Sequence, residues 1–365
     1  MADVAKRAGV SRALVSIVMR NEPGASPENR ERVWQAAKEL DYRPNFAAQM
    51  LRRTRTKHLG VIYTMAYGLD ADLVEALYPV AEEAGFSLAL GAMTATRNWR
   101  HAAEELLEFR CEALIVIAPE DDPRGFAEVA HAAPLIAVGR RITGVDSVHI
   151  DDPATSRLAV DHLVGLGHRR IVHVGGGNQP GAAGRRKGYL DAMRAHGLEE
   201  FAHVVAGDYS EESGAKAGSR LLDEKIEFTA VAAANDRMAV GVINSLTLAG
   251  LRVPDDVSMV GTDDSALARM SHRNLTSVSQ CVPCFAKHVV ELAVNRIDGS
   301  LEPSADVVVD PELVIRTSTA PPRDPARPHR AQPAHRRQDI GATDEAPEKR
   351  GLPSRITDPF KVSFD

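Results

Sequence analysis

The sequence predicts an all-α helix-turn-helix headpiece followed by an α/β domain of two lobes, each built on a doubly wound parallel sheet. Up to about residue 57 the apolar residues recur at helical spacing, and beyond it short apolar runs alternate with amphipathic stretches, as in βα units. At 365 residues the chain is also longer than one hydrophobic core usually supports. We expect the headpiece over 1–44, a linker over 45–57, the two-lobed domain over 58–320 and a tail over 321–365.

The headpiece shows the start and stop signals of three helices. Asp3 is expected to cap the first, Ser11 the second and Ser26 the third, with Pro27 at the first helical position. Gly9 supplies the permissive backbone that a sharp turn between two helices needs. The expected helices lie within DVAKRAG, SRALVSIVM and the run from Pro27 to Leu40.

The larger domain contains two groups of expected strands, separated near Pro153, which suggests two similar lobes. The strands before it are LGVIY, FSLALGA, ALIVIA, LIAVG and SVHI, and those after it are RIVHVGG, HVVAGD, AVAAA and SMVGT. Amphipathic runs between them, such as SRLAVDHLVGLG and DRMAVGVINSLTLAG, predict helices that end near glycine. A helix from Phe285 to Ile297 and the apolar segment DVVVDPELVI would let the chain cross back between the lobes.

Charge is distributed unevenly along the chain. The net charge is −6, yet residues 1–58 hold twelve Lys and Arg against six Asp and Glu, so they carry +6 and the remainder −12. A basic head on an acidic body is expected if only the head meets phosphates. Of the 21 prolines, 8 lie in residues 321–365, which predicts a disordered, solvated tail.

Several function classes are disfavoured by what the sequence lacks. It has no basic leader before an apolar core and no long apolar run, so we expect a cytoplasmic protein with no membrane partner. The three cysteines show no framework spacing, and the isolated CVPC run lacks the further ligands of a zinc site. A thioredoxin-like role for CVPC would require a strand-to-helix setting, and we expect neither role.

Enzyme motifs are also missing. The run VHVGGGNQPGAAG lacks the GxGxxG spacing of a dinucleotide site, and no GxxxxGK, HExxH or GxSxG motif occurs. We expect no enzyme activity, no cofactor and no metal.

The second headpiece helix has a face suited to the major groove of DNA. Arg12, Ala13, Ser16, Ile17 and Arg20 are expected to point outward, while small apolar residues pack inward. Ser11 and Ser16 can bond phosphate oxygens. A helical hairpin without DNA contacts is the alternative.

The run DVAKRAGVSRALVSIVM, with SPENRERVWQAAKELDYRPN and AAQML, resembles the headpiece and hinge of the lactose-repressor/galactose-repressor (LacI/GalR) family. HLVGLGHRRIVHVGG, RRKGYLDAM, ANDRMAVGV and VPDDVSMVGTDDS extend the resemblance to about residue 320. It implies a DNA-binding transcriptional regulator, most simply a repressor, that binds double-stranded DNA as a homodimer on a pseudopalindromic operator. Activation instead of repression, or a small-molecule-binding protein of this fold without specific DNA binding, are the alternatives.

The resemblance also implies a hinge helix that forms on operator DNA within residues 45–53. Asn45, Ala48 and Leu51 would then contact DNA, with Leu51 as an apolar wedge in the minor groove. An ordinary linker helix with Leu51 packed on the body is the alternative. Ile17 stands where the family usually has a guanine-reading arginine, and Leu14 replaces a usual threonine, so we expect a different base preference.

The body resembles periplasmic sugar-binding folds, with the ligand in a cleft between the lobes. Five residues match cleft positions of the family: Asp151, Arg185, Tyr209, Asn235 and Asp263. They suit a sugar or related polyol as effector, because guanidinium and carboxylate groups bridge adjacent hydroxyls and an aromatic face stacks on a ring.

Each of these five residues also has a plainer interpretation. Asp151 and Asp263 could cap helices, Asn235 could start its own helix, and Arg185 could form a solvated basic pair with its neighbour. The family's aromatic turn after the first strand is replaced by TMAYGLDADL, where Tyr67, Asp70 or Asp72 could contact the ligand instead.

Overall fold

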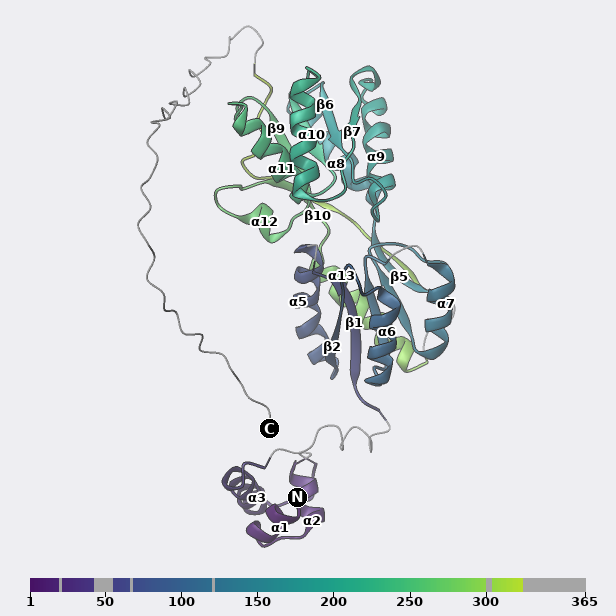
Figure 1. Ribbon diagram of the computed structural model, residues 1–365, viewed down its shortest axis with the longest axis vertical. Coiled ribbons are helices and arrows are strands. Elements are labelled where there is room, and N and C mark those ends of the chain that lie inside the picture. Colours follow the sequence, from purple (N-terminus) through teal and green to yellow (C-terminus); the bar gives the residue numbers. More distant parts are fainter. Residues whose placement is uncertain (20–21, 43–54, 66–67, 120–121, 300–303, 324–365) are drawn as a thin grey trace, which may run out of the picture. The chain divides into compact units, whose positions relative to one another are not determined.

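The computed structural model describes residues 1–19, 22–42, 55–65, 68–119, 122–299 and 304–323 (Figure 1). Most of the expected linker over 45–57 and nearly all of the expected tail over 321–365 therefore lie outside the described residues, and the predicted domain boundaries remain predictions.

Helices α1 (Ala2–Ala8), α2 (Arg12–Met19) and α3 (Pro27–Glu39) form the N-terminal unit. Gly9 ends α1 with a left-handed φ of 63°, which turns the chain into α2. Ser26 caps α3 by accepting a hydrogen bond from the Asn29 N–H, and Ser11 accepts one from the Leu14 N–H at 3.2 Å. A small core from all three helices holds the unit together, with Val4, Val15, Val18 and Val33 fully buried.

The expected cap at Asp3 is wrong. Helix α1 begins one residue earlier, at Ala2, with Met1 at the N-cap and no side-chain cap bond. Asp3 lies instead in the first turn, where its carboxylate is still favourable near the positive end of the helix dipole.

The larger domain contains two six-stranded sheets, in the orders β11-β5-β4-β3-β1-β2 and β12-β10-β9-β8-β6-β7. All strand pairs in the first sheet are parallel, and in the second only the pair of β10 and β12 is antiparallel. The strands are β1 (His58–Thr64), β2 (Ser87–Met93), β3 (Ala113–Ile117), β4 (Leu135–Val138), β5 (Asp146–Ile150), β6 (Ile171–Val174), β7 (His203–Val205), β8 (Ala230–Ala233), β9 (Ser258–Asp263), β10 (Thr276–Ser279), β11 (Asp306–Val309) and β12 (Glu312–Val314).

Helices cover both faces of each sheet, as expected for parallel strands buried on both sides. In the first lobe α5 and α13 share one core, while Trp99 of α6 stacks on Phe126 of α7 in the core of the other face. In the second lobe α10 and α11 cover one face and α8 and α9 the other. The helices are α5 (Gly68–Glu83), α6 (Trp99–Glu108), α7 (Pro123–Ala132), α8 (Asp152–Gly165), α9 (Ala182–Ala195), η1 (Glu199–Phe201), α10 (Glu211–Asp223), α11 (Asp236–Leu248), α12 (Ala266–Arg269) and α13 (Val282–Ile297).

The chain crosses between the lobes three times within the described residues: from β5 to α8, from β10 to α13, and from β11 to β12 (Figure 1). The second crossing was only partly expected from the sequence, because β10 was not predicted. Its sequence, TSVS, is short and polar, yet Thr276 and Ser277 are fully buried in this strand, which lies between β12 and β9. Their hydroxyl groups form hydrogen bonds within the protein.

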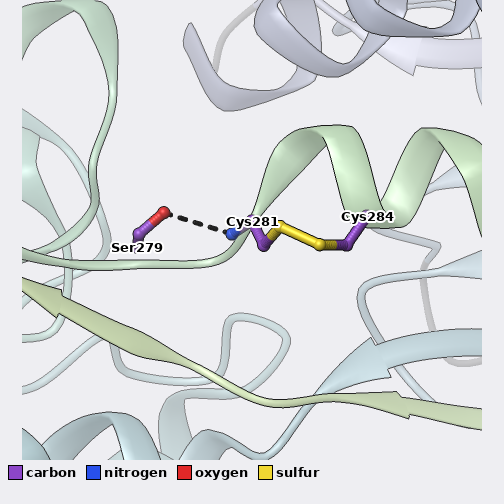
Figure 2. The surroundings of a disulfide bond; sticks show 3 residues. All are labelled: Ser279, Cys281 and Cys284. Carbon is purple, nitrogen blue, oxygen red and sulfur yellow. Dashed lines mark hydrogen bonds between the residues drawn. A yellow bond between two sulfur atoms is a disulfide. The ribbon is translucent and has the colours of Figure 1, made fainter.

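The CVPC run therefore lies between a strand and a helix, the setting that a thioredoxin-like role would require. Cys281 and Cys284 form a disulfide at the start of α13 (Figure 2). Cys111 is buried and has a free thiol.

Candidate functional site

A pocket of about 380 Å³ lies where the carboxyl ends of both sets of strands face each other. This edge is where open parallel sheets usually bind ligands. The first lobe contributes the start of α5 and the ends of β3 and β4, and the second lobe contributes the ends of β6 to β10. The lining residues are Gly68, Leu69, Asp70, Asp72, Ala118, Gly139, Gln179, Pro180, Arg185, Tyr209, Glu211, Asn235, Arg237, Asp263, Ser265, Ala266, Leu267 and Gln280.

Arg185 is the buried cation of this pocket. It lies on α9, is 5% exposed, and donates from Nε to Asp152 Oδ1 at 2.9 Å. Its Nη1 donates to the Ala234 carbonyl oxygen and lies 3.7 Å from Asp263 Oδ1. A buried guanidinium with two carboxylates beside it is held in one orientation. This excludes the alternative that Arg185 forms a solvated basic pair with its neighbour.

Asp263 ends β9 and forms the anionic side of the same cluster. Gln280 Nε2 donates to its Oδ1 at 2.6 Å, so the crossing from β10 to α13 is tied directly to the carboxylate. Burial raises the pKa of Asp263, and the Arg185 guanidinium partly offsets this rise. The next helix, α12, has Ser265 at its N-cap, so Asp263 does not cap it and instead lines the pocket.

Asp236 supports this arrangement from behind the lining. Its fully buried carboxylate accepts hydrogen bonds from the N–H and Oγ of Ser265, both at 2.8 Å, and from Ser277 Oγ at 2.6 Å. Burial and the nearby charge of Asp263 raise its pKa. These bonds fasten the start of α12 and the strand β10 to α11, so Asp236 positions the pocket without lining it.

Tyr209 and Asn235 form the aromatic and amide part of the lining. Tyr209 has a left-handed φ of 72°, donates its hydroxyl to the Pro180 carbonyl oxygen, and places its ring 5.6 Å from the Arg185 guanidinium. Asn235 caps α11 and donates from Nδ2 to the Tyr209 carbonyl oxygen at 3.0 Å. Asn235 thus starts its own helix, as the alternative proposed, and lines the pocket as well.

The structure brings four of the five expected effector residues together and leaves out Asp151. That residue accepts a hydrogen bond from the Ala154 N–H as the N-cap of α8 and does not line the pocket. Its neighbour Asp152 is the one that contacts Arg185. Asp70 and Asp72 do line the pocket, whereas Tyr67 lies outside the described residues.

Sequence reasoning missed Gln280 and Asp236. Gln280 follows a strand that was not predicted, so no pattern placed it at the strand edge. Asp236 stood beside Asn235 in the AND run, and its burial on the helix is visible only once the α11–β10 packing is known.

The outward face of α2 is partly open to solvent. Ser11, Arg12 and Ala13 are exposed, and Ser16 and Ile17 are partly exposed, while Val15 and Val18 between them are buried. Arg20, Asn45, Ala48 and Leu51 lie outside the described residues.

The comparisons with known proteins agree with this architecture. The family model for "Bacterial regulatory proteins, lacI family" matches residues 1–45, and the model for "Periplasmic binding protein-like domain" matches residues 160–319. The chain is 33% identical over 334 residues to the transcriptional regulator GalR of Escherichia coli (strain K12), covering 90% of this chain and 97% of GalR. The chain belongs to the lacI family of bacterial regulatory proteins. As a member of this family, it is a DNA-binding transcriptional regulator.

Solved structures of lacI-family proteins share the fold. The lac repressor dimer bound to operator and the anti-inducer ONPF superposes with a TM-score of 0.75 at 29% identity, covering 87% of this chain and 98% of that one. The CelR–cellobiose complex gives a TM-score of 0.63 at 29% identity, with the same coverage. The predicted fold class is confirmed: a lacI-type headpiece is joined to a periplasmic-binding-protein-like domain of two mostly parallel sheets. Among the residues described, no helix has the length and apolar character to cross a membrane.

Proposed function

We propose that the chain is a repressor whose affinity for operator DNA is set by a small polyhydroxylated molecule, a sugar or related polyol, bound in the pocket between the lobes. The observation that supports this best is the donor set of the pocket: the Arg185 guanidinium, the Asp263 carboxylate, the Asn235 amide and the Tyr209 ring meet in one cavity of about 380 Å³. Such groups bridge neighbouring hydroxyls and stack on a sugar ring. The cellobiose complex of CelR supports the same ligand class.

The DNA-binding part of the proposal concerns two sets of residues. Ser11, Arg12, Ala13, Ser16, Ile17 and Arg20 would meet the major groove and its phosphates, and Asn45, Ala48 and Leu51 the minor groove. One headpiece reads too few base pairs for useful specificity, so the active form is a homodimer on a pseudopalindromic operator. The protein would act in the cytoplasm and have no catalytic activity of its own, since its relatives are regulators.

Ligand-dependent thermal stability tests the effector. Thermal unfolding of the full chain is measured with each member of a panel of monosaccharides, disaccharides, polyols and nucleosides. A saturable rise in Tm identifies a ligand. Arg185→Met should abolish the rise, whereas the exposed neighbouring Arg186→Met should keep it. Asp263→Asn serves as the second pocket variant if Arg185→Met does not fold. A molecule that stabilises all these variants equally binds elsewhere, and a panel without any hit contradicts the ligand class.

Selection of bound sequences from a random duplex pool tests the DNA contacts. We expect an enriched symmetric site, and Ile17→Arg should shift one base position in each half-site toward guanine, because arginine bonds guanine O6 and N7. Enrichment of no symmetric site would favour a small-molecule-binding protein of this fold without specific DNA binding.

A further inference from the structure

The Cys281–Cys284 disulfide lies at the crossing of the chain from the second lobe into the first (Figure 2). Cys281 is the N-cap of α13, and Cys284 is in its first turn. Their Cα atoms are 5.3 Å apart, within the ordinary range for a disulfide, so the bond can break and form again without a large backbone movement.

The two sulfurs are placed for thiol–disulfide exchange. Both cysteines are partly exposed, so a thiol reagent can reach them. Helix α13 is 16 residues long and has no acidic residue in its first turn, and the positive end of a helix dipole stabilises a thiolate. Cys111 has the opposite setting, since burial raises the pKa of its thiol to about 11. Exchange should therefore occur at CVPC and spare Cys111.

The backbone at Cys281 lies next to the pocket and has an unusual conformation. Cys281 has a left-handed φ of 49°, a conformation that a residue with a side chain seldom keeps unless its surroundings fix it. Its N–H donates to Ser279 Oγ at 3.2 Å. The preceding residue, Gln280, is the one that donates to Asp263 in the pocket. A change in the conformation of Cys281 would thus reach the Arg185–Asp263 cluster through a single peptide unit.

A second cavity connects the same turn to the first lobe. It is lined by residues of the pocket's first-lobe wall together with the start of α13, namely Leu69, Asp70, Leu73, Ile117, Ala118, Val138, Gly139, Gln280, Val282 and Phe285. Val282 lies within the CVPC run. The residues on either side of Cys281 therefore reach both sites: Gln280 bonds Asp263, and Val282 lines this second cavity.

We propose that Cys281 and Cys284 form a reversible thiol–disulfide site that regulates the pocket through this crossing. A dithiol, either a small molecule or a protein, supplies two electrons and two protons. One of its thiolates attacks a sulfur of the disulfide to give a mixed disulfide. Its second thiolate then displaces that sulfur, leaving Cys281 and Cys284 as thiols and the dithiol as a disulfide.

Reduction frees Cys281 from its left-handed conformation and loosens the hold of Gln280 on Asp263. The oxidised protein then has the better organised pocket, and a preorganised site binds its ligand more tightly. Disulfides in reducing compartments are usually transient and sense redox state, which is the behaviour proposed here. The regulatory part of the inference rests on the proposed function, whereas the exchange chemistry does not.

Thiol–disulfide exchange is tested on the full chain. The chain is equilibrated with mixtures of reduced and oxidised dithiothreitol and alkylated with N-ethylmaleimide, and its intact mass is measured by mass spectrometry. We expect two labels on chains that are alkylated after reduction, both on CVPC, and none on chains that are reduced and then reoxidised before alkylation; Cys111→Ala should behave identically. Labelling that never reverses, or a chain in which Cys281 and Cys284 are not linked after oxidation, would overturn the site.

Hydrogen exchange and operator titration test the consequence. Peptides covering 276–286 should exchange faster after reduction, and the double variant Cys281→Ser, Cys284→Ser should exchange fast in every redox buffer. With an operator duplex recovered by selection, the operator affinities in the presence of a ligand found by thermal shift should differ by about fivefold or more between oxidised and reduced protein. Equal hydrogen-exchange rates in the oxidised and reduced protein would overturn the coupling to the pocket, and equal operator affinities would overturn the regulation. If neither form binds any duplex specifically, the proposed function fails while labelling and hydrogen exchange still decide the thiol site.

Discussion

Asp70, Asp236 and Asp263 are carboxyl groups that the fold removes from most of the surrounding water. Burial raises the pKa of each, because the charged form loses hydration. Asp236 and Asp263 recover part of this cost through hydrogen bonds and Arg185, and Asp70 accepts a hydrogen bond from the N–H of Thr64 at 3.1 Å. The pocket therefore contains a carboxyl group, Asp70, whose ionisation works against folding.

The titration of Asp70 gives a prediction with a definite sign. Burial raises its pKa to about 6 from the model-peptide value near 4, so between these values the folded state binds more protons than the unfolded state. The free energy of unfolding must then fall as pH rises from about 4 to about 6, by up to about 3 kcal/mol from this group.

The measurement is chemical denaturation of the ligand-free protein at several pH values across this range. Asp70→Asn should remove this contribution, and Glu75→Gln, at an exposed position of the same helix, should keep it. A pH profile that is the same in Asp70→Asn and in the unmodified chain would contradict the argument.

Among the elements, α8 and α9 pack so closely that glycine is required at their contact. A Cβ at Gly188 would lie 2.1 Å from the Pro153 carbonyl oxygen, which belongs to the first turn of α8. Gly165, at the other end of α8, has no atom within 4 Å of the same position. The two glycines thus form a matched pair on the same layer of helices.

Gly188→Ala should lower the free energy of unfolding by about 2 kcal/mol or more, because backbone must move to admit the methyl group. Gly165→Ala should leave it unchanged or raise it by less than about 1 kcal/mol, because alanine favours helix. Thermal unfolding of both variants beside the unmodified chain checks this. Equal stabilities would show that the α8–α9 contact is looser than the structure indicates.

The helices and strands also show which parts of the fold could be predicted from the sequence. Strands with continuous apolar runs, such as β3, and helices with clear caps, such as α3, were predictable because burial and capping leave local patterns. Strand β10 has no such local pattern, because its polar residues Thr276 and Ser277 are buried and form hydrogen bonds with segments distant in sequence. The disulfide setting and the place of Gln280 depended on that strand and could not be predicted without it.

Among the site residues, some were likewise predictable from the sequence and others depended on packing. Arg185 and Asp263 were predictable from the family resemblance, and the structure brings them to 3.7 Å. Asp151 and Asp152 are adjacent in sequence, and only the packing of α9 on α8 decides that Asp152 reaches Arg185 while Asp151 caps the helix.

At the scale of the whole molecule, charge separates the DNA-binding part from the sensing part. The first 58 residues carry +6 on a chain of net charge −6. An acidic body repels the phosphate backbone, so the headpieces should provide nearly all of the electrostatic attraction. In the proposed dimer, two headpieces would double the number of phosphate contacts and give the complex its symmetry.

The most direct test of this account is the affinity of the full chain for its selected operator as a function of salt, with the stoichiometry measured in the same titration. We predict two chains per duplex and a loss of affinity of roughly 1,000-fold or more between about 50 and 200 mM salt, because counterions are released from several phosphates. The same titration on a scrambled duplex should give much weaker binding. Weak binding that is equal on both duplexes, or one chain per site, would contradict a dimeric, sequence-specific regulator.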